Sequence, residues 1–186
     1  IKIPRNLRRA HPLVFRTIDV LSRVEPDEYG MLRPWNQEIL DVRVSRKMLK
    51  RAMRIMQALL TKIESLGFGV TAKKGDHLQT TKAIIFNETI SFGLNETARR
   101  IDHVLTGSEK KDLARYGSIS YAPKWDYEPT GVLSLQIDSW AYRGIRKKWN
   151  DGKSKVVEDG LKEFLINLVT IADLKRQRRL EDAERE

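Results

Sequence analysis

Few side chains in this sequence are of the types that carry out acid–base or nucleophilic chemistry. The chain has no Cys and three His, at positions 11, 77 and 103. Without Cys it can form no disulfide, and it offers neither a thiolate nucleophile nor a thiolate zinc ligand. It also lacks a Gly-x-x-x-x-Gly-Lys phosphate loop, a Gly-x-Ser-x-Gly elbow and a His-Glu-x-x-His pair. We therefore assign no catalytic residue, and the sequence implies no cofactor.

Carboxylates are the remaining candidates for metal-dependent chemistry. One set combines the Asp102-His103 pair with Glu96 or Glu109. A second set could converge at strand ends, as the carboxylates of metal-dependent nucleases do; it contains Asp41, Asp126, Glu128 and Asp138. Ordinary exposed positions explain both sets as well, so we assign no metal site.

Net charge is the most informative bulk property. The 186 residues include 35 Lys and Arg against 25 Asp and Glu, which gives a formal net charge of +10. A domain with this excess is attracted to polyanions, most often nucleic acid. We expect a nucleic-acid partner, DNA before RNA.

The first basic cluster spans a predicted strand–helix junction and the polar side of the helix that follows. Acidic residues are scarce there until Glu64. Lys and Arg on such a face neutralise phosphates and release counterions. The alternative is an ordinary solvated helix face. The cluster consists of Arg43, Arg46, Lys47, Lys50, Arg51 and Arg54.

The second basic cluster is interleaved with aromatic residues, a combination that grips the backbone and stacks bases. The alternative is an edge strand whose Trp residues reach the core while its charges prevent aggregation. Its phosphate contacts would be Arg143, Arg146, Lys147 and Lys148, with Tyr142 and Trp149 as stacking residues.

The hydrophobic pattern predicts helices at both ends and strands between them. Apolar residues at helical spacing indicate helices over 12–23 and 46–66 and a long final helix after Ser154. We expect Ser45 and Ser154 to cap the second and last of these. β-rich runs predict strands over 39–44, 68–73, 81–86, 89–94, 132–138 and 140–149, with an Asn87-Glu88 hairpin turn. We also expect a loop or one short helix over 109–116 and an irregular segment over 121–131.

This order predicts an α+β fold: a mainly antiparallel sheet of four to six strands, helices packed on one face and a long C-terminal helix. We divide the chain into a basic N-terminal arm with one helix and a loop (1–38), a single α+β core domain (39–174) and a charged helical tail (175–186). No apolar run approaches the length of a membrane-spanning helix, about 20 residues. Without a signal peptide, the cytoplasm is the expected location.

Several stretches together resemble the C-terminal region of an uncharacterised bacterial family that is often met in mobile or variable genome regions. They are residues 3–9 with 11–14, 40–45 with 51–56, 126–131 and 148–153. In that family a helix-turn-helix-like segment and a Pro-rich basic linker precede this region. The resemblance implies a DNA-associated protein and assigns no reaction or site. The helix-turn-helix is not within these residues, and the first residue is Ile1 rather than Met, so we expect a longer protein.

Three functions are consistent with these observations. The first is a non-enzymatic accessory domain of a DNA-associated bacterial protein that binds the nucleic-acid backbone electrostatically. The second is a protein-interaction or dimerisation module that uses the C-terminal helix and the segment around Trp125. The third is a metal-dependent nuclease that uses Asp41, Asp138, Asp102 and His103.

Overall fold

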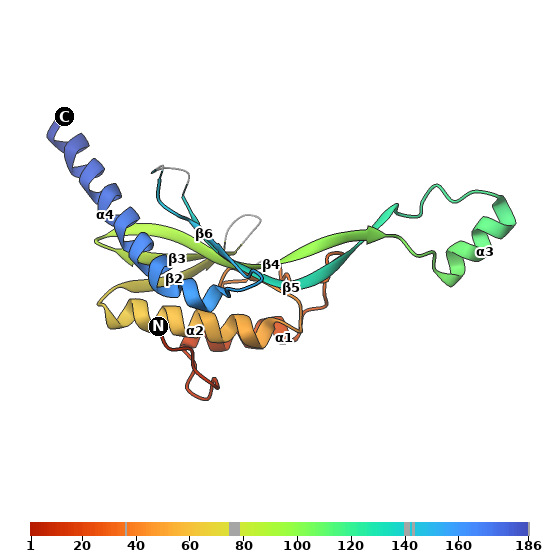
Figure 1. The fold of residues 1–186 in the computed structure, drawn as a ribbon, viewed down its shortest axis with the longest axis horizontal. Coiled ribbons are helices and arrows are strands. Elements are labelled where there is room, and N and C mark those ends of the chain that lie inside the picture. The colour runs from red at the N-terminus through yellow and green to blue at the C-terminus, as the bar shows by residue number, and fades with distance from the viewer. Residues whose placement is uncertain (36, 75–78, 140–141, 143, 186) are drawn as a thin grey trace.

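The computed structural model describes residues 1–35, 37–74, 79–139, 142 and 144–185. It confirms the α+β class (Figure 1). In chain order the elements are α1 (Pro12–Ser22), β1 (Val42–Arg43), α2 (Leu49–Ser65), β2 (Gly69–Lys74), β3 (Gln79–Ile85), β4 (Glu88–Asp102), α3 (Gly107–Tyr116), β5 (Trp125–Asp138), β6 (Lys148–Asn150), the 3-10 helix η1 (Val157–Gly160) and α4 (Leu161–Arg185).

The sheet is mainly antiparallel, as predicted. Its order is β2-β3-β4-β5-β6, and the short β1 pairs with β4 in parallel. The predicted strand over 39–44 forms ladder pairs only at Val42 and Arg43. Its alternation is nevertheless correct, because Leu40, Val42 and Val44 are buried.

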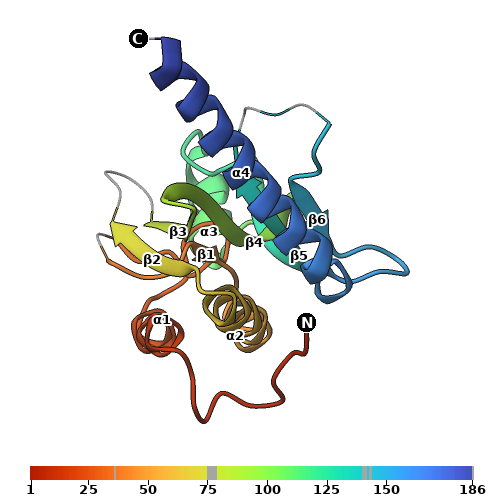
Figure 2. The ribbon, with the colours of Figure 1, turned by 90° about the vertical axis from the view of Figure 1, so that its left-hand side faces the viewer.

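Helices α2 and α4 cover one face of the sheet (Figure 2). The apolar stripe of α2, which includes Met53, Met56 and Leu60, is fully buried against the strands. On the α4 side, the Phe164 ring lies 5.7 Å from Phe92 of β4, centroid to centroid. Val14 of α1 belongs to the same buried cluster, so residues 1–38 pack on the core domain.

Both predicted serine caps are wrong. Helix α2 begins at Leu49, and the Ser45 carbonyl accepts hydrogen bonds from the N–H groups of Met48 and Leu49 at 3.0 and 3.1 Å. At the other end of the chain, η1 precedes α4, and the Asp159 carboxylate accepts a hydrogen bond from the Val156 N–H at 3.1 Å. Neither Ser45 nor Ser154 therefore caps a helix with its hydroxyl group. The acceptors at the two helix starts are the Ser45 main-chain carbonyl and the Asp159 carboxylate.

The β3–β4 hairpin is confirmed, with its turn one residue earlier than predicted. Phe86 and Asn87 form the turn, with φ of 53° and 65°. Glu88 is instead the first residue of β4, only 6% exposed, and its carboxylate accepts a hydrogen bond from Arg179 Nε at 2.7 Å. This contact, with Lys175 Nζ 3.7 Å from the same carboxylate, ties the beginning of the charged tail to the sheet.

The outer parts of β4 and β5 form a two-stranded projection that carries α3 at its tip (Figure 1). We call this projection, residues 97–131, the β-arm. The irregular segment predicted over 121–131 is correct only for residues 121–124, because β5 begins at Trp125 and pairs there with Asp102. At the base of the β-arm, the Glu96 carboxylate accepts hydrogen bonds from the N–H groups of Ser45 at 2.7 Å and Gly131 at 2.8 Å.

Candidate nucleic-acid interface

The N-terminal segment, residues 1–11, runs along the side of α2 that faces away from the sheet (Figure 2). Arg54 Nε of α2 donates a hydrogen bond to the Pro4 carbonyl at 2.6 Å. The His11 N–H donates to Gln57 Oε1 at 2.7 Å, and His11 Nε2 lies 2.9 Å from Glu64 Oε1. The segment is therefore fixed to α2, and its cations join those of the helix.

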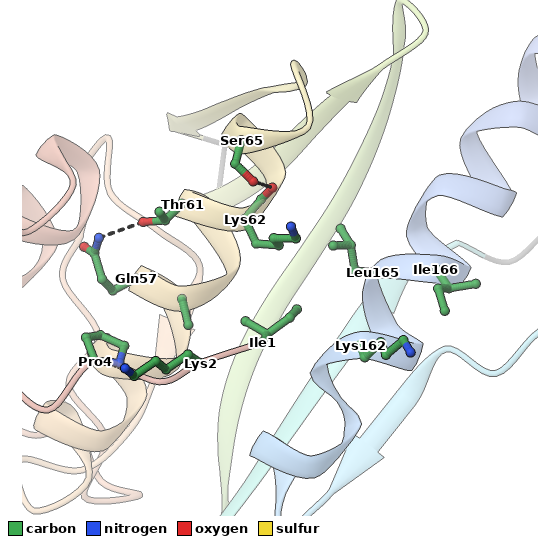
Figure 3. Close-up of a pocket in the computed structure, with 11 residues that line it drawn as sticks. Ile1, Lys2, Pro4, Gln57, Thr61, Lys62, Ser65, Lys162, Leu165 and Ile166 are labelled. Atoms are coloured by element: carbon green, nitrogen blue, oxygen red, sulfur yellow. Dashed lines mark hydrogen bonds between the residues drawn. The ribbon is translucent and has the colours of Figure 1, made fainter.

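A groove of about 610 Å³ lies between this segment, α2 and α4 (Figure 3). Each of the three elements contributes one lysine: Lys2, Lys62 and Lys162. In Figure 3, Lys62 extends from α2 toward α4. The lining also contains the Thr61 and Ser65 hydroxyls and the apolar side chains of Leu165 and Ile166. Because three lysines and two apolar side chains line it, the groove suits an anionic, partly apolar ligand better than a neutral one.

The three lysines of the groove and the other exposed cations of the N-terminal segment and of the outer side of the α2 region form a set that we call the basic face. All its cations are exposed, and none has an ion-pair partner within the described part of the chain. Lys47, Lys50, Arg54 and Thr61 share the outer side of the α2 region, since positions three or four apart are neighbours on a helix. The basic face consists of Lys2, Arg5, Arg8, Arg9, Lys47, Lys50, Lys62 and Lys162.

Carboxylates bordering the basic face already have partners. Glu64 contacts His11, and Glu158 accepts hydrogen bonds from Arg51 at 2.8 and 2.6 Å. Glu163 accepts from Arg146 at 2.9 Å and from the Trp149 indole at 2.8 Å. Because these acids are engaged elsewhere, they cancel little of the field of the exposed cations.

Only part of the first predicted cluster belongs to this surface. Lys47 and Lys50 are exposed on it, and Arg54 lies beside it, bound to Pro4. Arg46 instead donates hydrogen bonds to the carbonyls of Ser22 and Val24, at 3.0 and 2.7 Å, just after α1 ends. Arg51 is held by carboxylates of the β6–η1 region, and Arg43 lies on the opposite face of the sheet.

Trp149 cannot stack on a base, so this prediction is wrong. The side chain is 2% exposed, and its ring lies 5.3 Å from the Phe164 ring, centroid to centroid. Arg146 lies over the Trp149 ring with Cζ 5.1 Å from its centroid, and pairs with Glu163. The alternative interpretation, a strand whose Trp reaches the core, describes Trp149 correctly.

The rest of the second predicted cluster does not form one surface with the basic face. Tyr142 is half-buried against the core, and its φ of 66° marks a bend in the chain. The Lys147 carbonyl accepts a hydrogen bond from the Ile137 N–H at 2.8 Å, and Lys148 is exposed on the sheet face away from the helices. Arg143 lies outside the described residues.

His103 brings together two carboxylates at the tip of the β-arm. Its Nδ1 lies 2.9 Å from both oxygens of Asp126, and its Nε2 lies 3.0 Å from Glu109 Oε2. Hydrogen bonds to Asp126 and Glu109 raise the pKa of His103. Hydrogen bonds from the Thr106 N–H and hydroxyl, followed by the one from His103, lower the pKa of Glu109 to about 2. When both ring nitrogens carry protons, His103 can donate to both carboxylates and so clamp α3 to the strands.

The two metal sets of the sequence are not assembled as proposed. Glu96 binds main-chain N–H groups at the base of the β-arm, and Asp126 is joined to His103. Asp41 and Asp138 share the open face of the sheet, whereas Asp102 pairs with Trp125 in the β-arm. Across the described residues, no three His, Asp or Glu side chains are arranged to hold a metal ion.

Sequence reasoning assigned no nucleic-acid role to Lys2, Arg5, Arg8 and Arg9 of the basic N-terminal arm or to Lys162 of α4. The contacts of Pro4 and His11 with α2 place this arm beside the helix, which no local pattern predicts. Within the part of the chain that the structure describes, no helix has the length and apolarity needed to cross a membrane.

No family model, curated protein or solved structure matches this chain.

Proposed function

We propose that this chain is a non-enzymatic domain that binds the nucleic-acid backbone through its basic face. The observation that supports this function best is the set of eight exposed cations without ion-pair partners among the described residues, next to carboxylates that are already paired. Each Lys or Arg that neutralises a phosphate releases a counterion, which makes affinity depend steeply on salt.

The expected recognition is of backbone charge rather than base sequence. Five of the eight cations are lysines, whose ammonium groups act as point charges without the fixed fork of an arginine that reads a base edge. We expect the N-terminal segment and α2 to present these cations along the length of a rod-like polyanion. The resemblance to a bacterial family of mobile genome regions supports DNA as the polymer, the cytoplasm as the location and an accessory role beside a helix-turn-helix segment.

The test is binding of a fluorescently labelled 20-base-pair duplex and the matching single strand from 50 to 300 mM salt, with magnesium present. We expect micromolar affinity at low salt and a plot of log K against log salt with a slope of about −3 to −5. Two duplexes of unrelated sequence should differ by less than about three-fold in affinity. Absence of binding at 50 mM salt would overturn the proposal.

The same samples, run on a denaturing gel, address the nuclease hypothesis. We expect intact strands, because Asp41 and Asp138 have no third carboxylate or histidine beside them in the described chain. Strand cleavage that requires magnesium would replace the binding function with an enzymatic one.

Exposed apolar groups on the β-arm support protein interaction as a second candidate function. Val104 is 74% exposed, Tyr116 64% and Tyr121 62%, all near the tip that carries α3. Large exposed aromatic residues are enriched in interfaces. Sedimentation of the intact chain and of a chain lacking residues 175–186 tests the C-terminal helix as a dimer interface. A dimer that survives this truncation but not Tyr116→Ser would assign self-association to the β-arm.

A further inference from the structure

The sheet face opposite α2 and α4 is lined with polar side chains. Arg43, Asn95, Ser134 and Asn150 are direct neighbours on four adjacent strands. One row further along, Gly93 leaves room for the Asp41 side chain, because a Cβ at position 93 would lie 2.6 Å from Asp41 Oδ2. The chain thus places charged and amide groups on the open face.

Four polar atoms in this row and the next are buried and have no hydrogen-bond partner within the described residues: Asp41 Oδ1, Arg43 Nε, Asn95 Oδ1 and Ser134 Oγ. Ser134 is only 3% exposed. Arg43 Nε and Asp41 Oδ1 are 3.5 Å apart, an ion pair without a hydrogen bond. Buried polar groups are almost always hydrogen-bonded in folded proteins, so four such atoms without a hydrogen bond call for an explanation such as a bound ligand or an ordered water.

Arg43 and Asn95 also line a cavity of about 310 Å³ at the foot of the β-arm. Its other lining residues are Asp27, Tyr29, Met31, Arg33, Glu96 and Ala98. This volume is at the lower end of the range of small-molecule sites, about 300–1,000 Å³.

The outer wall of the cavity is formed by a loop that hydrogen bonds and one aromatic contact hold in place. Asp27 Oδ1 accepts hydrogen bonds from the N–H groups of Tyr29 and Met31, both at 2.9 Å. The Leu32 N–H donates to the Val44 carbonyl at 2.8 Å. Tyr29 lies against Tyr127 of the β-arm, with ring centroids 4.5 Å apart. Because these contacts do not involve the four atoms that lack a hydrogen bond, the cavity is preformed in the absence of a ligand.

We infer that this cavity binds a phosphorylated sugar, either free or as part of a mononucleotide. The guanidinium groups of Arg33 and Arg43 suit a phosphate. Asn95 Oδ1 can accept a hydrogen bond, which a sugar hydroxyl donates. Tyr29 supplies an aromatic surface for a sugar ring or a base.

Asp41 forms an ion pair with Arg43 beside this cavity. Burial, opposed by the neighbouring Arg43, raises the pKa of Asp41. Two other charged groups act on the pKa of Asp41: Asp138 raises it and Arg33 lowers it. The site lies on the far side of the sheet from the basic face, so this inference and the proposed function can fail independently.

Calorimetric titration of the intact chain with ribose 5-phosphate, AMP, adenosine and inorganic phosphate tests the inference. We expect ribose 5-phosphate or AMP to bind with a Kd below about 1 mM, and adenosine and phosphate to bind at least ten-fold more weakly. Tighter binding of AMP identifies a mononucleotide, and equal binding identifies the sugar phosphate as the recognised unit. No heat with either sugar phosphate, or equal affinity for inorganic phosphate, overturns the inference.

Variants separate a ligand site from a structural cluster. Arg43→Gln and Asn95→Ala should each weaken sugar phosphate binding at least ten-fold, whereas Asn150→Ala, at the exposed end of the same row, should not change it. Ser134→Ala removes an unpartnered buried hydroxyl and should raise the Tm by about 2 °C, as expected for groups kept for function rather than stability. A Tm lowered by Asn95→Ala and Ser134→Ala, with ligand binding unchanged, contradicts the site.

Discussion

Arg51 of α2 and Asp151, after β6, lie 100 residues apart in the chain and share two parallel hydrogen bonds of 2.7 and 2.8 Å. Arg51 Nε and Nη2 also donate to Glu158, at 2.8 and 2.6 Å. Asp151 also accepts from the N–H groups of Leu133 and Val157, both at 2.9 Å. One guanidinium thus joins α2 to β5, the end of β6 and η1.

The contacts between Arg51 and Asp151 favour the charged form of both groups. Burial opposes ionisation of Asp151, but hydrogen bonds from Arg51 and from the Leu133 and Val157 N–H groups outweigh it and lower the Asp151 pKa. Hydrogen bonds to Glu158 and then Asp151 raise the pKa of Arg51. Arg51 was predicted to contact phosphate, and its partners give it an architectural role instead.

Arg51→Met should destabilise the fold by about 2–3 kcal/mol, because two carboxylates lose their shared cation. The full range for breaking a buried pair is larger, about 3–5 kcal/mol, but the Arg51 side chain is 29% exposed. Urea unfolding followed by circular dichroism measures the change. Lys50→Met, at the adjacent exposed position, is the matched control and should alter stability by less than about 0.5 kcal/mol. Equal effects of the two variants would show that the network contributes little.

Trp149→Ala should cost about 3–5 kcal/mol in unfolding free energy, because a large buried ring is removed from its contact with Phe164. Lys148→Ala, the neighbouring exposed residue, should change stability by less than about 0.5 kcal/mol. Once both variants are corrected for the folded fraction, neither should change DNA affinity by more than two-fold. A large loss of affinity in folded Trp149→Ala would restore the stacking role that its burial argues against.

His103 should make the stability of the β-arm tip depend on pH. Its raised pKa means that the imidazolium contribution is complete below the unfolded value of about 6.5 and is lost as the pH rises through the folded value. The lowered pKa of Glu109 has the opposite sign, so its contribution is complete above about 4.5 and falls as the pH approaches 2. The stabilising window therefore lies between these limits, at about pH 5–6.

An NMR titration of the His103 ring and thermal unfolding of wild type and His103→Gln measure this effect. We expect a His103 midpoint above 6.5 and a Tm difference between the two proteins that is largest near pH 5.5 and shrinks above the midpoint. Because Asp102 lies outside the clamp, Asp102→Asn is the control and should preserve the midpoint to within about 0.3 units. A His103 midpoint at or below 6.5 would contradict the ion-paired clamp.

The core was predictable because one-sided burial leaves a clear period in the sequence. The stripe of Met53, Met56 and Leu60 predicts α2, and the alternation of Leu133, Leu135 and Ile137 predicts the inner half of β5. The outer half was missed because a two-stranded projection buries neither face. Tyr127 is 39% exposed, and Pro129 within this strand suggested a loop.

The candidate interface was only partly predictable for a different reason. Lys47, in the turn before α2, and Lys50, in its first turn, are close in sequence, and both are exposed as predicted. Lys2, Lys62 and Lys162 come from three separate elements, and no local pattern places them around one groove. The sequence also does not distinguish an exposed cation from one with partners, such as Arg46 or Arg51.

The measurement that tests the central claim most directly is the salt dependence of duplex binding by two quadruple variants. One replaces Lys47, Lys50, Lys62 and Lys162 on the basic face with Gln. The other replaces Lys73, Lys82, Lys148 and Lys155, which lie outside it, and so carries the same change in net charge. Because each lost phosphate contact removes about 0.9 from the slope, the first variant should lose about 2–4 units of slope, and the second less than about 1. Equal losses in both variants would show that net charge alone, and not the basic face, attracts nucleic acid.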